Sequence, residues 1–160
     1  MARIQSGRYT HDYEGDLVVF LIGMHVRRWW RPDVWGPTFM AMPKMLDELY
    51  RDPSSGFLGA RSLFGAGGPT VIQYWSSVES LYAYALEPDA KHRPAWAAFN
   101  QRVRSHPGVT GVWHETYVVE AAETIYVDAP VMGLAAATGH TRVTRRLDGA
   151  RARIDAALSR

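Results

Sequence analysis

Residues 17–26 read LVVFLIGMHV, and this stretch decides the fold. Apolar and β-branched residues occupy both its odd and its even positions, which predicts a β-strand that is covered on both faces. Gly23 within it indicates a bulge or a close approach to the backbone. The even positions carry the bulkier side chains and are expected to meet helices. His25 and Arg27 are then expected to face the opposite side, toward a cavity between two subunits.

A helix and a hairpin are predicted next. Apolar residues recur at helical spacing over residues 39–50, and Pro43 inside this pattern marks a kink or the start of the helix. Residues 57–64 and 70–75 are predicted strands, joined by a hairpin loop with the sequence GAGGP (65–69). A phosphate-binding loop is a much weaker interpretation of this segment, because a strand rather than a helix follows it.

The next part of the chain completes the sheet. Ser76 and Glu79 form a capping-box pattern before a short helix, and Pro94 suits the first turn of another. Residues 109–120 are predicted to form the fourth strand. The order strand–helix–strand–strand–helix–strand is that of a ferredoxin-like α+β sandwich, with helices on one face of an antiparallel sheet.

The second face of that sheet needs a cover of its own. A second copy of the sheet is the simplest cover, which predicts a homodimer whose two sheets face each other. The chain is expected to divide into an N-terminal arm (1–16), a ferredoxin-like domain (17–139) and a basic C-terminal tail or helix (140–160). An Ala/Gly-rich loop is expected around residues 132–139.

Composition narrows the function classes. The chain of 160 residues has six Trp, eight Tyr and five Phe, a surplus that suits a wide core, a lined pocket or an interface. The absence of Cys excludes disulfides, a thiol nucleophile, thiolate-bound zinc and iron–sulfur clusters, and it is compatible with the cytoplasm, where we expect the protein. No apolar run approaches the roughly 20 residues that span a bilayer, so no membrane partner is expected.

Basic charge is concentrated at the C-terminal end. Residues 140–160 contain six Arg and two Asp, a net charge of +4, which leaves −2 for the rest of a chain whose total is +2. A nucleic-acid-binding protein needs its basic stripe on the folded body, so no nucleic acid partner is expected. The sequence lacks the common nucleotide, serine-hydrolase and zinc-protease motifs, and its histidines show no metal-ligand spacing.

Three histidines lie where chemistry can use them. His92 precedes a helix and suits a general base or a haem ligand, since imidazole titrates near neutral pH. His25 ends the first strand. His114 shares one strand face with Thr116, and the residues between and beside them share the other. Each of the three positions also has an ordinary structural interpretation. The remaining histidines are expected in exposed loops or arms: His11, His106 and His140.

Several segments taken together resemble a known family. They are VVFLIGMHVRRWWRP (18–32), FMAMPKMLDELYRDPSSGFLGARS (39–62), LEPDAKHRPAWAAFN (86–100) and GVWHETYVV (111–119). They are similar to small bacterial and fungal monooxygenase-like proteins of the dimeric α+β barrel superfamily, which also contains haem-dependent enzymes. The resemblance implies a ferredoxin-like protomer, a homodimer and an apolar cavity between sheet and helices. It also places His92 near the proximal histidine of haem-binding relatives.

The leading hypothesis is a monooxygenase-like enzyme that acts on a small apolar, cyclic or aromatic molecule without a cofactor. His92 or His114 would be the base, and Arg27 would stabilise an enolate or phenolate oxygen. His25 and Glu115 are further catalytic candidates. Six aromatic residues are predicted to line the pocket: Trp29, Trp30, Tyr74, Trp75, Trp113 and Tyr117. Two alternatives stay open, a haem enzyme with His92 as axial ligand and a non-catalytic module that only holds a ligand.

Overall fold

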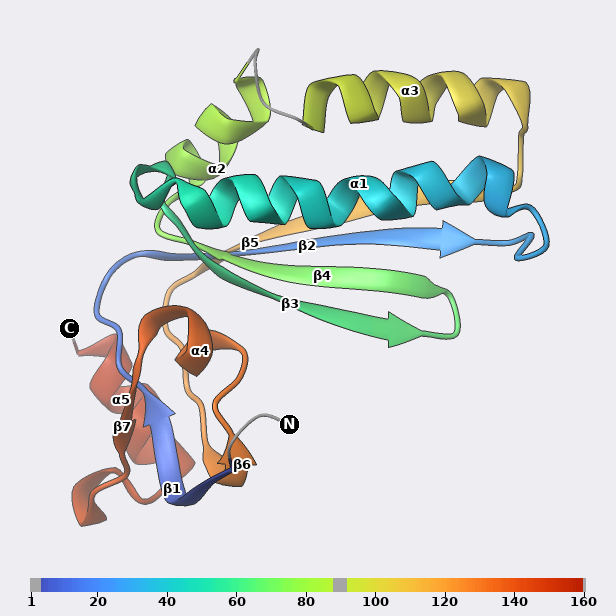
Figure 1. Ribbon diagram of the computed structural model, residues 1–160. Helices are drawn as coiled ribbons and strands as arrows, with labels where there is room; N and C mark the ends of the chain where they lie inside the picture. Colours follow the sequence, from blue (N-terminus) through green and yellow to red (C-terminus); the bar gives the residue numbers. More distant parts are fainter. Residues whose placement is uncertain (1–3, 88–91, 160) are drawn as a thin grey trace.

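The chain forms a larger unit around a four-stranded sheet and a smaller unit around a three-stranded one (Figure 1). The computed structural model describes residues 4–87 and 92–159, with only the backbone of His92. The larger unit contains β2 (Leu17–Val26), α1 (Pro32–Arg51), β3 (Phe57–Gly65), β4 (Gly68–Trp75), α2 (Val78–Leu86), α3 (His92–Ser105) and β5 (Thr110–Val119). The smaller unit contains β1 (Ile4–His11), β6 (Tyr126–Pro130), α4 (Leu134–Thr138), β7 (His140–Arg142) and α5 (Ala150–Leu158).

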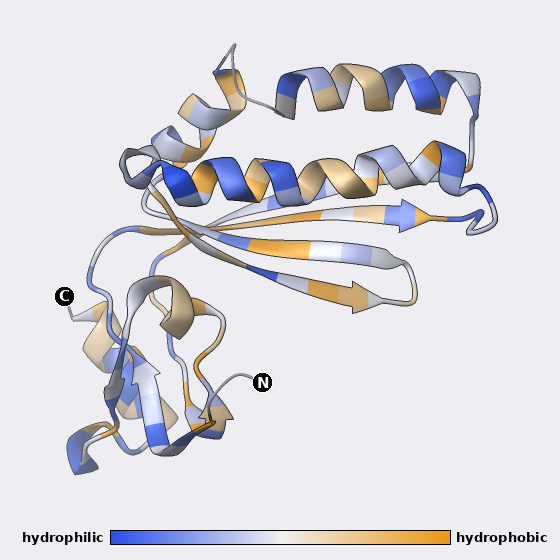
Figure 2. Ribbon diagram, viewed as in Figure 1, coloured by the Kyte–Doolittle hydropathy of each residue, from blue (hydrophilic) through white to orange (hydrophobic). Residues whose placement is uncertain are grey.

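The larger unit has the predicted ferredoxin-like α+β fold. Its strands are antiparallel in the order β3-β4-β2-β5, so that the predicted first strand, β2, lies between β4 and β5. Helices α1, α2 and α3 all lie on one side of the sheet (Figure 1). Hydrophobic residues run along β2 and β4 and form bands on α1 (Figure 2). One face of β2 is therefore covered by the helices of the same chain, as its sequence pattern predicts.

The even positions of β2 face the helices, as predicted. Val18 is buried in a cluster with Leu49 of α1, Trp75 of β4 and Leu81 of α2. The odd positions face the opposite side, which we call the far face of the sheet. Gly23 lies on that face, where a Cβ atom would overlap the indole of Trp113. The close approach predicted for Gly23 is thus a contact with an aromatic ring.

Two helix starts differ from the sequence prediction. Helix α1 begins at Pro32 and continues through Pro37 and Pro43, because packing of its apolar face on the sheet outweighs the local cost of proline. Helix α2 is capped by Ser77 rather than Ser76, and the Ser77 hydroxyl accepts from the backbone N–H of Ser80 at 3.0 Å. The backbone N–H of Ser76 instead donates to the carbonyl of Gly56, the residue before β3.

The smaller unit was predicted least well. Residues 4–11, expected to be part of a polar arm, form β1 at the centre of the sheet β6-β1-β7. The loop expected around residues 132–139 contains α4. Two histidines expected to be exposed are half-buried here: His11 lies within hydrogen-bond distance of Thr124, and His140 contacts Gln5 and the ring of Tyr9. The inward positions of β1 carry mainly polar residues, such as Gln5, Thr10 and His11, so the strand gave no apolar face to recognise.

Helix α4 covers one corner of the far face. It packs on β3 at Gly59, where a Cβ atom would lie 2.9 Å from the Cβ of Ala137. The sequence assigned the whole cover of this face to a second copy of the chain. The structure corrects that expectation, since part of the cover comes from the same chain.

Candidate functional site

An apolar cavity of about 360 Å³ lies between the four-stranded sheet and helices α1 and α3. Among its described lining residues none is charged, and the only hydroxyl groups belong to Thr38 and Ser62. The other lining residues are Ile22, Gly23, Met24, Phe39, Ala41, Met42, Pro43, Met45, Leu46, Phe64, Pro69, Val71, Ala95, Trp96, Phe99 and Val112. Such a lining suits an apolar ligand with very few polar groups.

Residue size explains why the space is hollow here. Ala41 of α1 and Ala95 of α3 leave a gap where larger side chains would meet. Aromatic side chains border the gap: the rings of Trp96 and Phe99 stack with their centroids 5.4 Å apart. Three lining methionines add flexible thioethers that adapt to the shape of a ligand.

A half-buried cation contacts Thr38, one of the residues that line the cavity. Arg102 of α3 donates from Nη2 to the Oγ1 atom of Thr38 at 3.2 Å. The Arg102 Nε and the His106 Nδ1 are buried and have no hydrogen-bond partner among the described residues. Near the start of α1, the pKa of Asp33 is lowered, mainly by its hydrogen bond from Arg31 and slightly by the charge of His106.

The structure does not gather the predicted catalytic residues around the cavity. His114 is on the helix side of β5, with its ring centroid 5.6 Å from that of Phe20, but it is exposed and is not one of the lining residues. His25 lies at an exposed position on the far face, and Arg27 is exposed in the turn after β2. Glu115 is also on the far face. The side chain of His92 lies outside the described residues, and its backbone begins α3.

The Glu115 carboxylate has a partner on its own strand. It accepts a hydrogen bond of 2.7 Å from the hydroxyl of Tyr117, and this bond raises the pKa of Tyr117. Tyr117 is 51% exposed. The pair is therefore a surface feature of the described chain, on the face opposite the cavity.

The six aromatic residues predicted to line a pocket are spread over the larger unit. Trp29 and Trp30 are exposed after β2, and Trp113 packs over Gly23 on the far face. Trp75 is fully buried and donates from Nε1 to the Oε1 of Gln73 at 3.0 Å. Tyr74 lies on the far face near Tyr126 of the smaller unit, and its pKa is raised first by burial and then by Tyr126.

The sequence did contain a signal for the true lining. Met42 and Leu46 belong to the apolar stripe predicted for residues 39–50, and Trp96 and Phe99 belong to the stripe predicted after Pro94. Arg102 falls on the inner face of α3, one position from the expected Val103. An arginine on the same helical face as apolar residues is a sequence signal for a functional site, and a search limited to histidines does not detect it.

Comparison with known proteins gives the family. Residues 17–134 match the family model described as Monooxygenase af470-like. This chain belongs to that family. It is 31% identical over 165 aligned residues to Monooxygenase af470 of Aspergillus fumigatus, covering 92% of this chain and 56% of that protein. The chain thus spans little more than half the length of this relative.

Solved structures similar to this af470-like chain share low sequence identity. SnoaB, a cofactor-independent oxygenase from Streptomyces nogalater, is 14% identical, with a TM-score of 0.47 over 66% of this chain and 94% of SnoaB. A dimeric protein with a ferredoxin-like fold from Bacteroides fragilis is 11% identical, with a TM-score of 0.41 over 64% of this chain and 96% of that protein.

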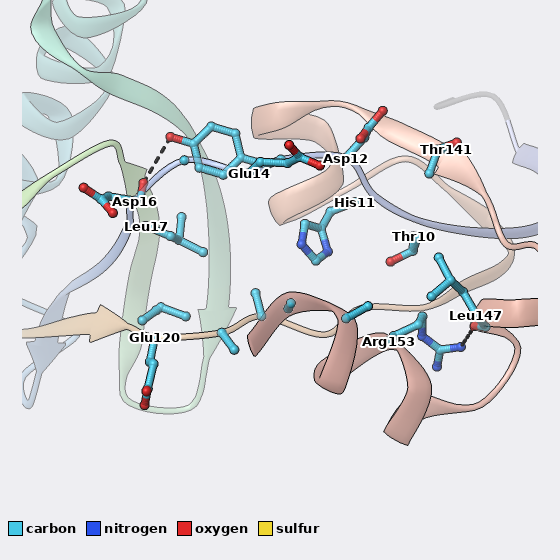
Figure 3. A pocket seen from close by; sticks show the side chains of 17 residues that line it. Thr10, His11, Asp12, Glu14, Asp16, Leu17, Glu120, Thr141, Leu147 and Arg153 are labelled. Atoms are coloured by element: carbon cyan, nitrogen blue, oxygen red, sulfur yellow. Dashed lines mark hydrogen bonds between the residues drawn. The ribbon is translucent and has the colours of Figure 1, made fainter. Parts of the chain in front are cut away.

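A second, polar cavity of about 340 Å³ lies where the two units of this af470-like protein meet (Figure 3). Acidic side chains surround it, among them Asp12, Asp16 and Glu120. Arg153, an arginine that lines this cavity, is buried and hydrogen-bonded to other residues of the chain. Arg153 Nε donates to Glu123 Oε1 at 2.6 Å, and its Nη1 donates to the backbone carbonyls of residues 147 and 148. This cleft is held together by its own polar contacts and offers little to an apolar ligand.

The described residues form no group of three or more His, Cys, Asp or Glu side chains arranged to hold a metal ion. Within the same described part of the chain, no helix is long and apolar enough to cross a membrane.

Proposed function

We propose that this protein is a monooxygenase that binds a small aromatic molecule in the apolar cavity and oxidises it with O₂. The observation that carries the proposal is the cavity itself. Its volume of about 360 Å³ falls within the usual range of small-molecule sites, and its described lining is apolar with two hydroxyl groups. Membership of the af470-like family supports an oxygenase over a pure ligand carrier.

The proposed reaction needs no cofactor when the substrate itself supplies the electrons. A base removes a proton from an activated CH₂ group, and the resulting carbanion reduces O₂ and forms a C–O bond. The hydroperoxide then loses water. One CH₂ and one O₂ give one ketone and one water, so atoms and electrons balance. The apolar lining disfavours water around the carbanion, which would slow its reprotonation.

His92 is the first candidate for the base. It begins α3 three residues before Ala95, which lines the cavity. His114 is the second candidate, since it lies on the helix side of β5 beside Phe20. The other predicted catalytic residues, His25, Arg27 and Glu115, are not among the residues that line the cavity. We therefore assign them no step.

Haem fits the described lining poorly. A haem iron takes an imidazole, thiolate, thioether or phenolate ligand, and b-type haem carries two propionates. The described lining supplies methionine thioethers, but no imidazole, thiolate or phenolate and no charged group to hold the propionates. An imidazole ligand would have to come from His92, and we derive no step through haem.

A homodimer remains part of the proposal. Helix α4 covers only the corner of the far face near Gly59, and Trp113 and Tyr117 are 38% and 51% exposed elsewhere on it. Aromatic residues of this kind are enriched in subunit interfaces. A second copy of the sheet would cover this remaining surface.

Oxygen consumption with a panel of tricyclic phenols and anthrones tests the function. The panel is run with a metal chelator, and sedimentation of the same samples measures the mass, where twice the monomer is expected. Ala95→Phe fills the cavity and is expected to abolish oxygen uptake. Ala97→Phe is the matched control, because Ala97 is exposed on the same helix. His92→Ala is expected to slow turnover with little effect on substrate binding.

Four outcomes would contradict the proposal. The first is that the wild type consumes no oxygen with any substrate, and the second is that Ala95→Phe remains as active as Ala97→Phe. Retention of a bound phenol without turnover would favour the non-catalytic binding module. A haem absorbance band that disappears in His92→Ala would favour the haem enzyme.

A further inference from the structure

We infer that the cavity selects a ligand with an anionic oxygen, a phenolate or enolate, which binds the Thr38 hydroxyl while Arg102 behind it supplies the positive charge. The inference rests on the proposed function of this cavity and adds its substrate class. Thr38 would touch the ligand, and Arg102 would be a positioning residue that acts through Thr38.

Arg102 is half-buried, so only part of its guanidinium is withdrawn from water. It lies on the same face of α3 as Ala95 and Phe99, which line the cavity, because these residues are separated by four and three positions. A guanidinium stays charged in proteins, and burial of a charge is normally compensated by an ion pair. Arg102 makes no ion pair with any described residue, and its Nε is buried without a hydrogen-bond partner among them.

The hydrogen bond between Arg102 and Thr38 determines which role the Thr38 hydroxyl has left for a ligand. The Oγ1 of Thr38 accepts from Arg102 Nη2 at 3.2 Å. The hydroxyl proton is therefore available to a second acceptor, and no described protein group accepts it. Thr38 lines the cavity, so a ligand oxygen is the acceptor within reach. A donor that itself accepts from a cation is polarised, which strengthens its bond to an anion.

The surroundings favour an anion over a neutral ligand. The lining contributes no charge from β2, β3, β4, β5, α1 or α3 among the described residues. Two titratable groups beyond the lining are His106, one turn after Arg102, and Asp33 at the start of α1. Asp33 is paired with Arg31 at 2.7 Å, which offsets its negative charge. The unpaired Arg102 charge therefore acts on a ligand oxygen through Thr38, next to a lining without charged groups of its own.

This arrangement would assist the proposed reaction. Stabilising an enolate or phenolate oxygen lowers the pKa of the substrate and makes proton removal easier. The sequence had suggested Arg27 for this task, but Arg27 is exposed and does not line the cavity. Thr38 of α1 lines the cavity, and Arg102 of α3 contacts it by a hydrogen bond.

A pair of coumarins tests the inference. 7-Hydroxy-4-methylcoumarin ionises to a phenolate whose absorbance differs from that of the neutral form, and 7-methoxy-4-methylcoumarin cannot ionise. In the wild type, the apparent pKa of the bound phenol is expected to fall below that of the free phenol. Thr38→Val and Arg102→Met should abolish this fall and weaken binding of the phenolate about tenfold, about 1.4 kcal/mol. Binding of the methoxy compound should stay unchanged.

Two further variants separate charge from structure. Arg102→Lys keeps the charge and should retain most of the pKa effect. Arg104→Met removes an exposed arginine from the same helix and should behave as the wild type. Because threonine and valine have nearly the same shape, Thr38→Val decides the question even if Arg102→Met unfolds.

The results distinguish this inference from the proposed function. An unchanged phenolate affinity and pKa in Thr38→Val would overturn the inference while binding of the methoxy compound still supported the cavity as a ligand site. Failure of both coumarins to bind the wild type would overturn both. Equal loss of both coumarins in every variant would show a purely structural role for the pair and would also overturn the inference.

Discussion

The layer between the helices and the four-stranded sheet is filled at one end and hollow at the other. At the closed end, Trp75 is fully buried, and its ring centroid is 5.3 Å from that of Phe57 and 5.9 Å from that of Tyr84. At the open end, the same layer contains the cavity, bordered by small residues such as Ala41 and Ala95. The strands are shared, so the difference lies in side-chain size.

The far face of the sheet follows the same division. Helix α4 covers the closed end at Gly59, whereas at the open end Trp113 covers Gly23 and is itself 38% exposed. The closed end is thus supported on both faces by the chain. At the open end, the cavity lies on the helix side and Trp113 is partly exposed on the far face. The filled core and the cavity thus lie at opposite ends of one fold.

The largest expected effect on stability tests the difference between the filled end and the hollow end of the layer. Trp75→Ala should lower the free energy of unfolding by about 3–5 kcal/mol, because it opens a void in a filled region. It also removes the partner of the buried Gln73 amide. Met42→Ala should cost about 2 kcal/mol or less, since Met42 already borders empty space. Urea denaturation followed by circular dichroism measures both. Equal losses would contradict the distinction between the two ends.

A smaller effect is expected from two glycines on the far face. Gly59→Ala would press a methyl group against the backbone of α4 and should cost about 1–3 kcal/mol, the range for disturbing such a fixed contact. Gly23→Ala meets only the ring of Trp113, which is partly exposed and can turn away, so less than about 1 kcal/mol is expected. Thermal unfolding of the two variants gives the comparison, and a larger loss in Gly23→Ala would reverse it.

The smallest effect concerns pH at the closed end. Burial raises the pKa of Tyr84 above its ordinary value of 10.0, helped by the Glu48 carboxylate that accepts its hydrogen bond at 3.2 Å. The unfolded chain therefore ionises first, so this contribution to stability is complete below pH 10 and is lost as pH rises further. Tyr84→Phe should show a shallower loss of stability above pH 10. Identical slopes in alkaline urea titrations would contradict this assignment.

Particular residues show how far the sequence leads. The double-sided apolar pattern of residues 17–26 predicted the central strand, and the helix and hairpin patterns after it were enough for the ferredoxin-like order. Local chemistry also predicted the hairpin and the approximate cap of α2. By contrast, β1 pairs with β6 and β7 across more than 110 residues, and no local pattern specifies such a partner.

The site shows the same limit. The sequence showed a surplus of aromatic residues but not which of them line the cavity. Trp75 is buried in the core, Trp113 lies on the far face, and Trp96 lines the cavity. Strand alternation correctly split His114 from Glu115, yet it could not tell which side faces the helices. That choice depends on which residues of β5 pair with β2, a tertiary property.

The sequence by itself determined the sheet, its helices and the family, because apolar periodicity and motif order are local and repeat along the chain. Only the tertiary structure decided where the layer is hollow, since a cavity depends on side-chain volumes contributed by distant elements. It also decided that Arg102 and Thr38, 64 positions apart, share a hydrogen bond at the cavity wall. The chemical role of a charged side chain depends on its neighbours, and tertiary packing determines which residues those neighbours are.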